Sequence, residues 1–452
     1  MGKYFGTDGI RGIAGEELNA ELAFKIGRAA ATVLEREYGK RLNVLIGKDT
    51  RISCDMLEAA LSAGLCSAGA EVNLLGVLPT PGAAYLTIKA GADMGVVISA
   101  SHNSFEHNGI KMFGGDGYKL SDALEERIEE LIDDPSEIPT LTGGALGRIS
   151  RISRDHGNGA NEYVNHLTTA WLGGKFEGRV LIDCANGAAA VTARRLFRKL
   201  DIEFEMNFDE PNGVNINENC GSMHLDYLKQ MMKTGRFSLG VAFDGDADRC
   251  LIVDELGNTI DGDMMLCIMS REMRNLGLLK GGGFVGTVVS NAGMEVFARE
   301  NDLKFYRANV GDRNVLEMMR ELGCNLGGES SGHIIFSDEA STGDGQLAAI
   351  NFINILKKSG KTASELVADI PRFPQVMPSF KLTGGVEHRD RIMNHPDLKS
   401  EIDKYEKILE GYGRVFIRPS GTEPIIRVLV EAKTEEQATE IANHFLEWME
   451  LV

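Results

Sequence analysis

The chain has 452 residues, a length that suggests about three or four domains. Because 43% of the residues are hydrophobic, these domains can have substantial cores. Its formal net charge of −18 argues against a nucleic-acid partner, which needs a basic surface, and no apolar run approaches the ~20 residues of a membrane helix. Seven scattered cysteines without a C-x-x-C pair, and no signal peptide, predict reduced thiols in a cytoplasmic, unanchored protein.

The first 150 residues predict an α/β domain. Helices are expected over residues 17–37 and 53–68, where apolar residues recur at helical spacing, and strands over 43–46 and 72–75. A further helix follows Thr80-Pro81 and leads to a short apolar strand at 96–98. Strands separated by helices favour parallel pairing with right-handed crossovers. Residues 135–147 are interpreted as the linker that leaves this domain.

The same alternation continues in two smaller units and then changes. Residues 151–253 predict a second α/β domain, with a helix at 163–171, strands at 180–183 and 239–243, and a helix at 189–199. Residues 254–370 predict a third, with a strand at 284–289 and a helix at 294–300. Three occurrences of strand, small polar turn and helix suggest a repeated domain. Residues 371–452 predict a separate α+β domain with strands at 414–417 and 425–431 and a closing helix at 435–449.

A small polar loop follows the strand at 96–98. Ser101 offers a hydroxyl nucleophile beside His102, and an Asn108-Gly109 turn is expected to bring Lys111 back to the same edge of the sheet. Loops at strand ends commonly carry chemistry in α/β proteins. A Ser/Asn-rich loop that only satisfies its own backbone is the alternative reading of this stretch alone.

The strand at 239–243 runs directly into an acidic loop. Asp244, Asp246 and Asp248 alternate there, and three carboxylates this close repel unless a cation joins them. Arg249 stands where a calcium-binding EF-hand needs glycine, and the flanking segments are strands. The loop therefore predicts an oxygen-ligated Mg²⁺.

Three more polar loops are candidates for one composite site. Arg11 lies between glycines near the start of the chain, Glu329, Ser331 and His333 carry groups suited to sugar hydroxyls, and residues 418–427 form a potential phosphate cradle. Arginine pairs match phosphate oxygens, and hydroxyls and backbone N–H groups can add to them. The residues expected in the cradle are Arg418, Ser420, Gly421, Thr422 and Arg427.

Together these motifs resemble the α-D-phosphohexomutase superfamily, and within it the bacterial phosphoglucosamine mutase family. The likeness runs from Phe5 to Val430 and includes the stretches 99–111, 244–249, 286–291, 327–333 and 418–427. The resemblance implies three similar α/β domains and a smaller α+β C-terminal domain around a central cleft. It also implies an enzyme with a small-molecule sugar phosphate as substrate, acting as a monomer or homodimer.

The resemblance also implies a role for each candidate residue. Ser101 would be the phosphoserine and, with Asp244, Asp246 and Asp248, would bind Mg²⁺. The other catalytic groups would be His102, Lys111, Arg11 and His333, and the substrate would be bound by Arg249, Glu329, Ser331, Arg418, Ser420, Gly421, Thr422 and Arg427.

The reaction expected from this resemblance interconverts glucosamine 6-phosphate and glucosamine 1-phosphate through a sugar bisphosphate, feeding UDP-N-acetylglucosamine and cell-wall precursor synthesis. Ser330 occupies a position where phosphoglucosamine mutases usually have Gln and many phosphomannomutase/phosphoglucomutases have Met. A phosphoglucomutase/phosphomannomutase therefore stays open as an alternative. A non-catalytic sugar-phosphate sensor on the same scaffold is a second alternative, although it would be expected to lose Ser101 or one of the aspartates, and none is lost. A serine hydrolase is disfavoured because Ser99-Ala100-Ser101 lacks the G-x-S-x-G elbow.

Overall fold

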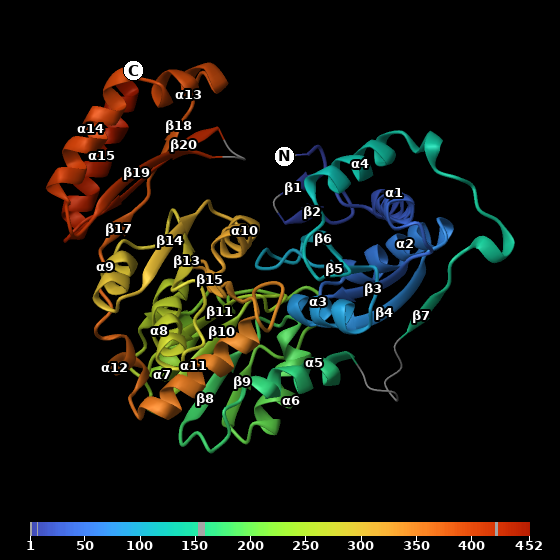
Figure 1. Cartoon of the computed structure of the whole chain (residues 1–452), viewed down its shortest axis with the longest axis horizontal. Helices are drawn as coiled ribbons and strands as arrows, with labels where there is room; N and C mark the ends of the chain where they lie inside the picture. Colours follow the sequence, from blue (N-terminus) through green and yellow to red (C-terminus); the bar gives the residue numbers. More distant parts are fainter. Residues whose placement is uncertain (1, 7, 152–158, 421–423) are drawn as a thin grey trace.

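Four β-sheets with flanking helices organise the chain (Figure 1). The computed structural model describes residues 2–6, 8–151, 159–420 and 424–452. Three sheets are mixed and covered by helices, and the fourth is antiparallel, which confirms the predicted fold class. Within the described ranges, no helix is both long and apolar enough to cross a membrane.

The first sheet has the order β1-β2-β6-β5-β3-β4-β7. Its strands β3, β4, β5 and β7 run parallel, as expected, whereas β6, β2 and β1 continue the sheet antiparallel. The elements of this unit are β1 (Phe5–Gly6), β2 (Gly9–Ile13), α1 (Ala20–Tyr38), β3 (Asn43–Lys48), α2 (Ser53–Ser67), β4 (Glu71–Val77), α3 (Thr80–Lys89), β5 (Met94–Ile98), β6 (His107–Gly114), α4 (Asp122–Asp133), two 3₁₀ turns (Pro135–Glu137 and Gly143–Ala145) and β7 (Ile149–Arg151).

Alternating side chains of this sheet enter two different cores. Val96 and Ile98 of β5 pack with α1, α2 and α4 on one face. Val97, between them, enters the core on the opposite face, which also contains residues of α3 and of the second and third units. This alternation follows from the two-residue period of a strand. The end of β5 is consequently held from both faces at the point where the Ser101 loop begins.

Two predictions for this unit are wrong. Asn108 and Gly109 form no turn but lie inside β6, paired with β2, and the chain reverses earlier, in the loop at 101–106. Gly109 is needed there because a Cβ would lie 2.5 Å from the Ser99 carbonyl oxygen. The predicted linker at 135–147 stays with this unit, since β7 follows it and pairs with β4.

The second and third sheets lie next to each other, with the orders β12-β11-β10-β8-β9 and β14-β13-β15-β16. The buried helix α11 (Gly345–Ser359) packs between their elements and contacts β10, β11 and α8. The elements of the second unit are α5 (Gly159–Leu167), a 3₁₀ turn (Thr168–Ala170), β8 (Arg179–Asp183), α6 (Ala189–Lys199), β9 (Glu203–Asn207), α7 (Asp226–Met232), β10 (Leu239–Phe243), β11 (Cys250–Val253) and β12 (Thr259–Ile260).

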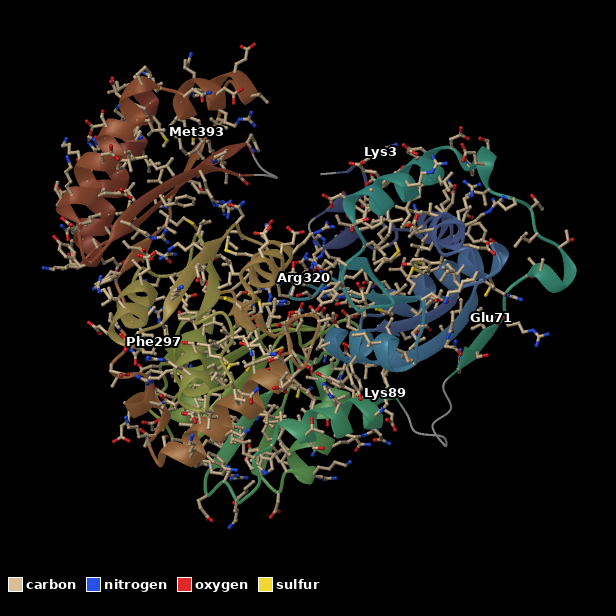
Figure 2. The ribbon with its side chains drawn as sticks, in the orientation of Figure 1. Lys3, Glu71, Lys89, Phe297, Arg320 and Met393 are labelled. Carbon is tan, nitrogen blue, oxygen red and sulfur yellow. The ribbon has the colours of Figure 1, made fainter. Side chains whose placement is uncertain are left out.

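The third unit follows, and its α10 contacts the first unit. Arg320 of α10 lies where the third unit meets the first (Figure 2). Its guanidinium carbon is 4.7 Å from the centroid of the Tyr118 ring. Besides α11, the third unit contains α8 (Gly262–Asn275), β13 (Gly283–Thr287), α9 (Gly293–Glu300), β14 (Lys304–Ala308), α10 (Asp312–Leu322), β15 (Leu326–Gly328), β16 (Ile334–Phe336) and α12 (Ala363–Val367).

The fourth unit is an antiparallel sheet backed by helices, and it joins the third through buried polar contacts. Glu431 of β20 is fully buried; it accepts the Ala292 N–H of the third unit at 3.2 Å and pairs with Arg414 at 2.7 Å. The elements are β17 (Gln375–Val376), β18 (Ser379–Lys381), α13 (Gly385–Met393), α14 (Pro396–Ile408), β19 (Arg414–Pro419), β20 (Ile425–Glu431) and α15 (Glu435–Leu451).

The limits predicted for the domains at residues 150, 253 and 370 stay predictions, with one correction. β12 lies beyond residue 253, yet it pairs with β11 of the second sheet. The second unit therefore extends through the β11–β12 hairpin, because a strand pair cannot be divided without exposing its backbone hydrogen-bonding groups.

Candidate active site

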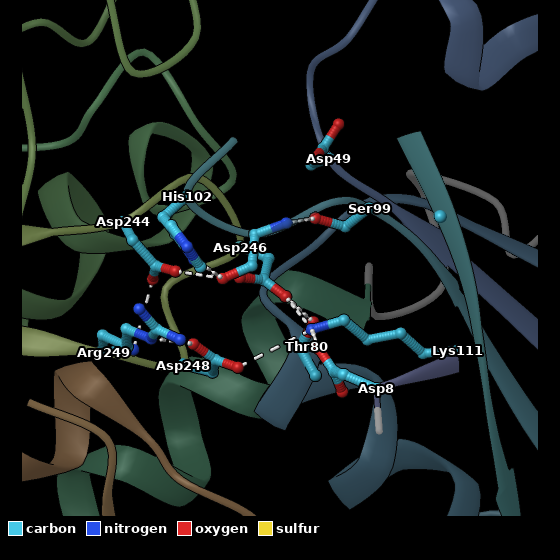
Figure 3. Close-up of polar contacts among 12 residues, drawn as sticks. Asp8, Asp49, Thr80, Ser99, His102, Lys111, Asp244, Asp246, Asp248 and Arg249 are labelled. Atoms are coloured by element: carbon cyan, nitrogen blue, oxygen red, sulfur yellow. Dashed lines mark hydrogen bonds and ion pairs between the residues drawn. The ribbon is translucent and has the colours of Figure 1, made fainter. Parts of the chain in front are cut away.

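Ser101 lies in the turn that follows β5. Its backbone is in the left-handed region, with a φ of 52°, and its N–H donates to Ser99 Oγ at 2.9 Å. The side chain is almost fully buried, and its hydroxyl donates to Asp244 Oδ2 at 2.6 Å. The loop of the first unit is thereby brought against the acidic loop of the second unit (Figure 3).

The acidic loop begins where β10 ends. Asp244, Asp246 and Asp248 are all buried, and one carboxylate oxygen from each lies within 4.8 Å of the others. Asp246 Oδ1 and Asp248 Oδ1 are buried without a hydrogen-bond partner among the described residues. Burial raises the pKa of Asp244 well above its ordinary value, and the two neighbouring carboxylates add to this. Clustered carboxylate oxygens with unused acceptors fit a hard divalent cation such as Mg²⁺.

Lys111 is a buried cation beside this loop. It projects from β6, and its Nζ lies 2.8 Å from Asp246 Oδ2 and 2.9 Å from Asp8 Oδ2. Burial lowers the pKa of Lys111, but the carboxylates of Asp246, Asp8 and Asp248 outweigh burial and raise the pKa well above its usual value. The side chain is therefore a protonated donor, held at the rim of the acidic loop.

Asp8 and Thr80 belong to this network, although the sequence interpretation did not single them out. Asp8 pairs with Arg11 and with Lys119, the latter at 2.8 Å, as well as with Lys111. Thr80 Oγ1 donates to Asp246 Oδ2 at 2.6 Å. The available signals were the position of Asp8 in the same glycine-rich segment as Arg11 and the position of Thr80 just after a strand of the same sheet.

The two predicted histidines contact different residues of the site. His102 Nδ1 is 3.3 Å from Ser101 Oγ, and burial, followed by the Arg249 and Arg11 charges, lowers the pKa of His102 to about 4. His333 Nδ1 lies 3.6 Å from Asp248 Oδ2. Burial lowers the pKa of His333, but Asp248 raises it to about 9, which would favour a charged ring.

The hydrogen bonds of His333 favour a different state. The Gly343 N–H donates to His333 Nε2 at 3.1 Å, so Nε2 must keep its lone pair. This geometry describes a neutral ring with its proton on Nδ1, facing Asp248. A cation in the acidic loop would favour the same neutral ring, because it would cancel much of the Asp248 charge that raises the pKa of His333.

The loop at 329–333 reaches the acidic loop through backbone contacts. Arg249 and His333 form an isolated β-bridge, and the Arg249 N–H donates to Asp244 Oδ1 at 3.2 Å. Glu329 Oε1 accepts the Gly311 N–H at 2.9 Å, whereas Ser331 Oγ is buried with no hydrogen-bond partner among the described residues. An unsatisfied buried hydroxyl next to the acidic loop is available to a polar ligand.

The predicted cradle lies on the β19–β20 hairpin of the fourth unit. Arg418 and Arg427 are directly opposite each other in the strand register. Burial and the Arg427 charge lower the pKa of Arg418. The Ser420 N–H donates to the Ile425 carbonyl at 2.9 Å, and Gly421 and Thr422 lie outside the described residues. Two neighbouring guanidiniums are stabilised by an anion between them.

Most of the predicted site residues thus lie together at the junction of the first three units. They are the three aspartates, Ser101, His102, Lys111, Arg11, Arg249 and His333. The arginine pair is carried by the fourth unit, whose β19–β20 hairpin extends toward the first unit in Figure 1. A hydroxyl nucleophile, a cation-binding loop and protonated side chains in one place can support phosphoryl transfer. The role of each residue stays a prediction.

Sequence comparisons match each unit separately. The phosphoglucomutase/phosphomannomutase alpha/beta/alpha domain I matches residues 2–138, domain II 161–257, domain III 261–373 and the C-terminal domain 384–447.

Curated relatives match along the whole chain. Phosphoglucosamine mutase of Clostridium botulinum (strain Langeland) is 46% identical over 444 residues, covering 98% of both chains. Phosphoglucosamine mutase of Shouchella clausii is 46% identical over 448 residues, covering 99% of this chain and 98% of the relative, and that of Caldanaerobacter subterraneus is 47% identical over 448 residues, covering 98% of each.

Solved structures share the fold. A phosphoglucomutase/phosphomannomutase family protein from Burkholderia thailandensis has a TM-score of 0.79 at 24% identity, covering 98% of this chain and 97% of the other. Aspergillus fumigatus N-acetylphosphoglucosamine mutase, crystallised with GlcNAc-6P and magnesium, has a TM-score of 0.66 at 20% identity, covering 98% and 95%. From the four domain matches and the full-length relatives, the chain belongs to the phosphoglucomutase/phosphomannomutase family of the α-D-phosphohexomutase superfamily.

Proposed function

We propose that this chain is a phosphoglucosamine mutase, which interconverts glucosamine 6-phosphate and glucosamine 1-phosphate through a phosphoserine at Ser101. The observation that carries the proposal is the 2.6 Å contact between the Ser101 hydroxyl and Asp244, beside the buried carboxylates of Asp246 and Asp248. Support for the amino-sugar substrate comes from the 46–47% identical full-length relatives named for that activity.

The proposed cycle begins with phosphorylated Ser101. A sugar hydroxyl attacks the phosphorus, the bond between phosphorus and Ser101 Oγ breaks, and a bisphosphate forms; after the bisphosphate turns around, Ser101 Oγ takes the other phosphoryl group. In each half-reaction the hydroxyl that gains the phosphoryl group loses one proton, and the oxygen that leaves phosphorus gains one. Lys111 and His333 are the groups proposed to carry these protons. Both lie at the edge of the acidic loop, with Lys111 Nζ 3.7 Å and His333 Nδ1 3.6 Å from Asp248 Oδ2.

The acidic loop suits Mg²⁺, with Asp244, Asp246, Asp248 and the Ser101 phosphate as the residues that would hold it. A bound Mg²⁺ would neutralise charge on the phosphate oxygens next to Ser101. Two of the carboxylate oxygens accept no hydrogen bond from the described residues, which agrees with a place for a cation. The Aspergillus fumigatus relative, crystallised with magnesium and GlcNAc-6P, offers the same combination of metal and sugar phosphate.

Substrate binding is proposed to use both ends of the site. Glu329 and Ser331 would bind sugar hydroxyls, with Arg249 beside them, and the hairpin residues Arg418, Ser420, Gly421, Thr422 and Arg427 would hold the phosphate that does not react. The hairpin must then accept the 6-phosphate in one half-reaction and the 1-phosphate in the other.

An isomerase assay with glucosamine, glucose and mannose phosphates tests the proposal. We expect glucosamine 6-phosphate to give the highest kcat/KM, and Ser101→Ala to lose both turnover and covalent phosphate, measured by intact mass. A preference for glucose or mannose phosphate would favour the phosphoglucomutase/phosphomannomutase alternative, to which Ser330 draws attention. Absence of turnover with all three sugars would favour the sensor. Cytoplasmic location and a monomeric or homodimeric state also stay predictions.

A further inference from the structure

Arg51 is buried beside the nucleophile loop, and every N–H group of its guanidinium has an acceptor within reach. The Arg51 and Asp49 side chains are 0% exposed, and Arg51 Nε donates to Asp49 Oδ2 at 2.8 Å. The remaining four N–H groups of the guanidinium can each donate to a carbonyl of the loop or of the first residue of β6. These carbonyls belong to Ser101 (3.0 Å), Asn103 (2.9 Å), His107 (3.0 Å) and Ser104.

Asn217 of the second unit donates to two of the same carbonyls. Its Nδ2 donates to the Ser101 and Asn103 oxygens, at 2.9 Å each. The Asn217 backbone N–H donates to the Ala185 carbonyl at 2.9 Å, which anchors the residue within its own unit. The peptide that follows Ser101 is consequently held between a donor from the first unit and a donor from the second.

This arrangement has a specific consequence for Ser101. A serine with a φ of 52° is in the left-handed region, which non-glycine residues adopt only when the surroundings hold them there. Arg51 and Asn217 donate to the Ser101 carbonyl, so they restrain the peptide group that joins Ser101 to His102. This restraint helps to keep the Ser101 backbone in the left-handed conformation. The direction of the Ser101 hydroxyl, 2.6 Å from Asp244, depends on the same backbone conformation.

We propose that Arg51 and Asn217 are positioning residues that hold Ser101 in the orientation required for phosphoryl transfer, an inference that rests on the function proposed above. Positioning is the main contribution a protein makes to this chemistry. Lysine would not replace Arg51, because three donors on a point charge cannot serve one carboxylate and four carbonyls spread around a planar fork. Asp49 acts through Arg51 by fixing the orientation of the guanidinium.

The experiment measures the single-turnover phosphorylation of Ser101. Dephosphorylated full-length protein is mixed with glucose 1,6-bisphosphate and Mg²⁺, and intact mass measures phosphorylation of Ser101 over time. In this step the bond between Ser101 Oγ and phosphorus forms, the bond between the sugar oxygen and phosphorus breaks, and the serine proton passes to the sugar oxygen. Asn217→Ala is compared with Asn215→Ala. Asn215 lies in the same segment, but its side chain bonds within that segment, to the Glu210 carbonyl and the Asn212 N–H.

We expect Asn217→Ala to slow phosphorylation by about 10- to 100-fold, with the half-saturating bisphosphate concentration changed less than about twofold, since the loss affects orientation and not the sugar contacts. Asn215→Ala should phosphorylate within about twofold of the wild-type rate, even where it lowers the melting temperature. Arg51→Lys should be slowed at least as much as Asn217→Ala. Asn217→Ser, with one donor left, should fall between Asn217→Ala and the wild type.

Two results would overturn the inference: equal rates for Asn217→Ala and the wild type, or equal slowing in the Asn217 and Asn215 variants, which would indicate a general loss of stability. If Asn217→Ala does not fold, the rates of Asn217→Ser and Arg51→Lys decide by the same criteria. Failure of the proposed function would look different, because Ser101→Ala would then accept phosphate or keep full mutase activity.

Discussion

Replacing Gly245 with alanine should displace the nucleophile loop without removing any functional group. Gly245 lies between the first two carboxylates of the acidic loop. A Cβ at this position would be 2.5 Å from the Ser101 carbonyl oxygen, 2.8 Å from Ile216 Cδ1 and 3.0 Å from Asn217 Nδ2. Real Cβ atoms essentially never approach another heavy atom within 3.0 Å, and ordinary van der Waals contact of a Cβ begins at 3.4 Å. The 2.5 Å approach to the Ser101 oxygen therefore requires the two loops to separate by about 0.5 to 0.9 Å.

The Ser101 carbonyl cannot move freely, because Arg51 and Asn217 both donate to it. We therefore expect much of the displacement to appear between Ser101 Oγ and the carboxylates. A misplacement near 1 Å costs on the order of 100-fold in rate, and overpacking of this kind costs about 1–3 kcal/mol of stability. Gly245→Ala should accordingly lower kcat by roughly 30- to 100-fold while leaving the protein folded.

The assay follows conversion of glucosamine 6-phosphate, with thermal unfolding measured on the same samples. Gly144→Ala is the matched control, because a Cβ on Gly144 would meet nothing within 4 Å. The control should keep wild-type kcat and melting temperature. A kcat for Gly245→Ala within about threefold of wild type would refute the reasoning, since it would mean that the close approach of the two loops does not set the position of Ser101.

Three further outcomes are expected. Asp246→Asn removes one anionic oxygen ligand, so it should weaken Mg²⁺ binding, measured by calorimetry, and lower turnover. Chelation of the metal should abolish activity until Mg²⁺ is restored, and metal-independent turnover would contradict this. Arg418→Ala should lower kcat/KM by about 10- to 100-fold, from the loss of one charge-assisted hydrogen bond, and equally in both directions because the equilibrium constant is fixed. A kcat/KM within about threefold of wild type would contradict a phosphate-binding role for Arg418. Burial raises the pKa of Asp344 to about 6, above the ordinary aspartate value of ~3.9, so the folded protein binds this proton more tightly than the unfolded chain does. The stability that the protonated carboxyl contributes is therefore lost as pH rises from about 4 to 6. Asp344→Asn should reduce that decline by about 2 kcal/mol in unfolding free energies measured across the range, and an unchanged slope would show that other groups cause it.

Local patterns in the sequence predicted most of the elements. The strand at 239–243 and the helix at 189–199 have their predicted bounds, because a continuous apolar run and a regular amphipathic period are both local properties. The helix expected at 17–37 begins instead at Ala20, after Asn19 accepts the Leu22 N–H as an N-cap. The cap decides this end of the helix, and hydrophobic periodicity does not report it.

The site was predictable where its residues form a compact motif and less so where they meet across the chain. Asp8 binds Lys111 although the two are far apart in sequence, and nothing local indicates that pairing. The Asn108-Gly109 pair has the composition of a turn, but pairing with β2 and β5 holds it and Lys111 in a strand. Such cases are decided by tertiary contacts, which override local propensity.

The contact between Ser101 and Asp244 joins positions separated by 143 residues and belonging to different units. During synthesis, a chain that has completed only the first unit would contain Ser101 without Asp244, its carboxylate partner. It would also lack Asn217, which donates to the Ser101 and Asn103 carbonyls. We therefore expect Ser101 to accept phosphate only after the second unit has left the ribosome, folded and packed against the first unit. Covalent phosphate on Ser101 would then mark chains whose first half has assembled correctly.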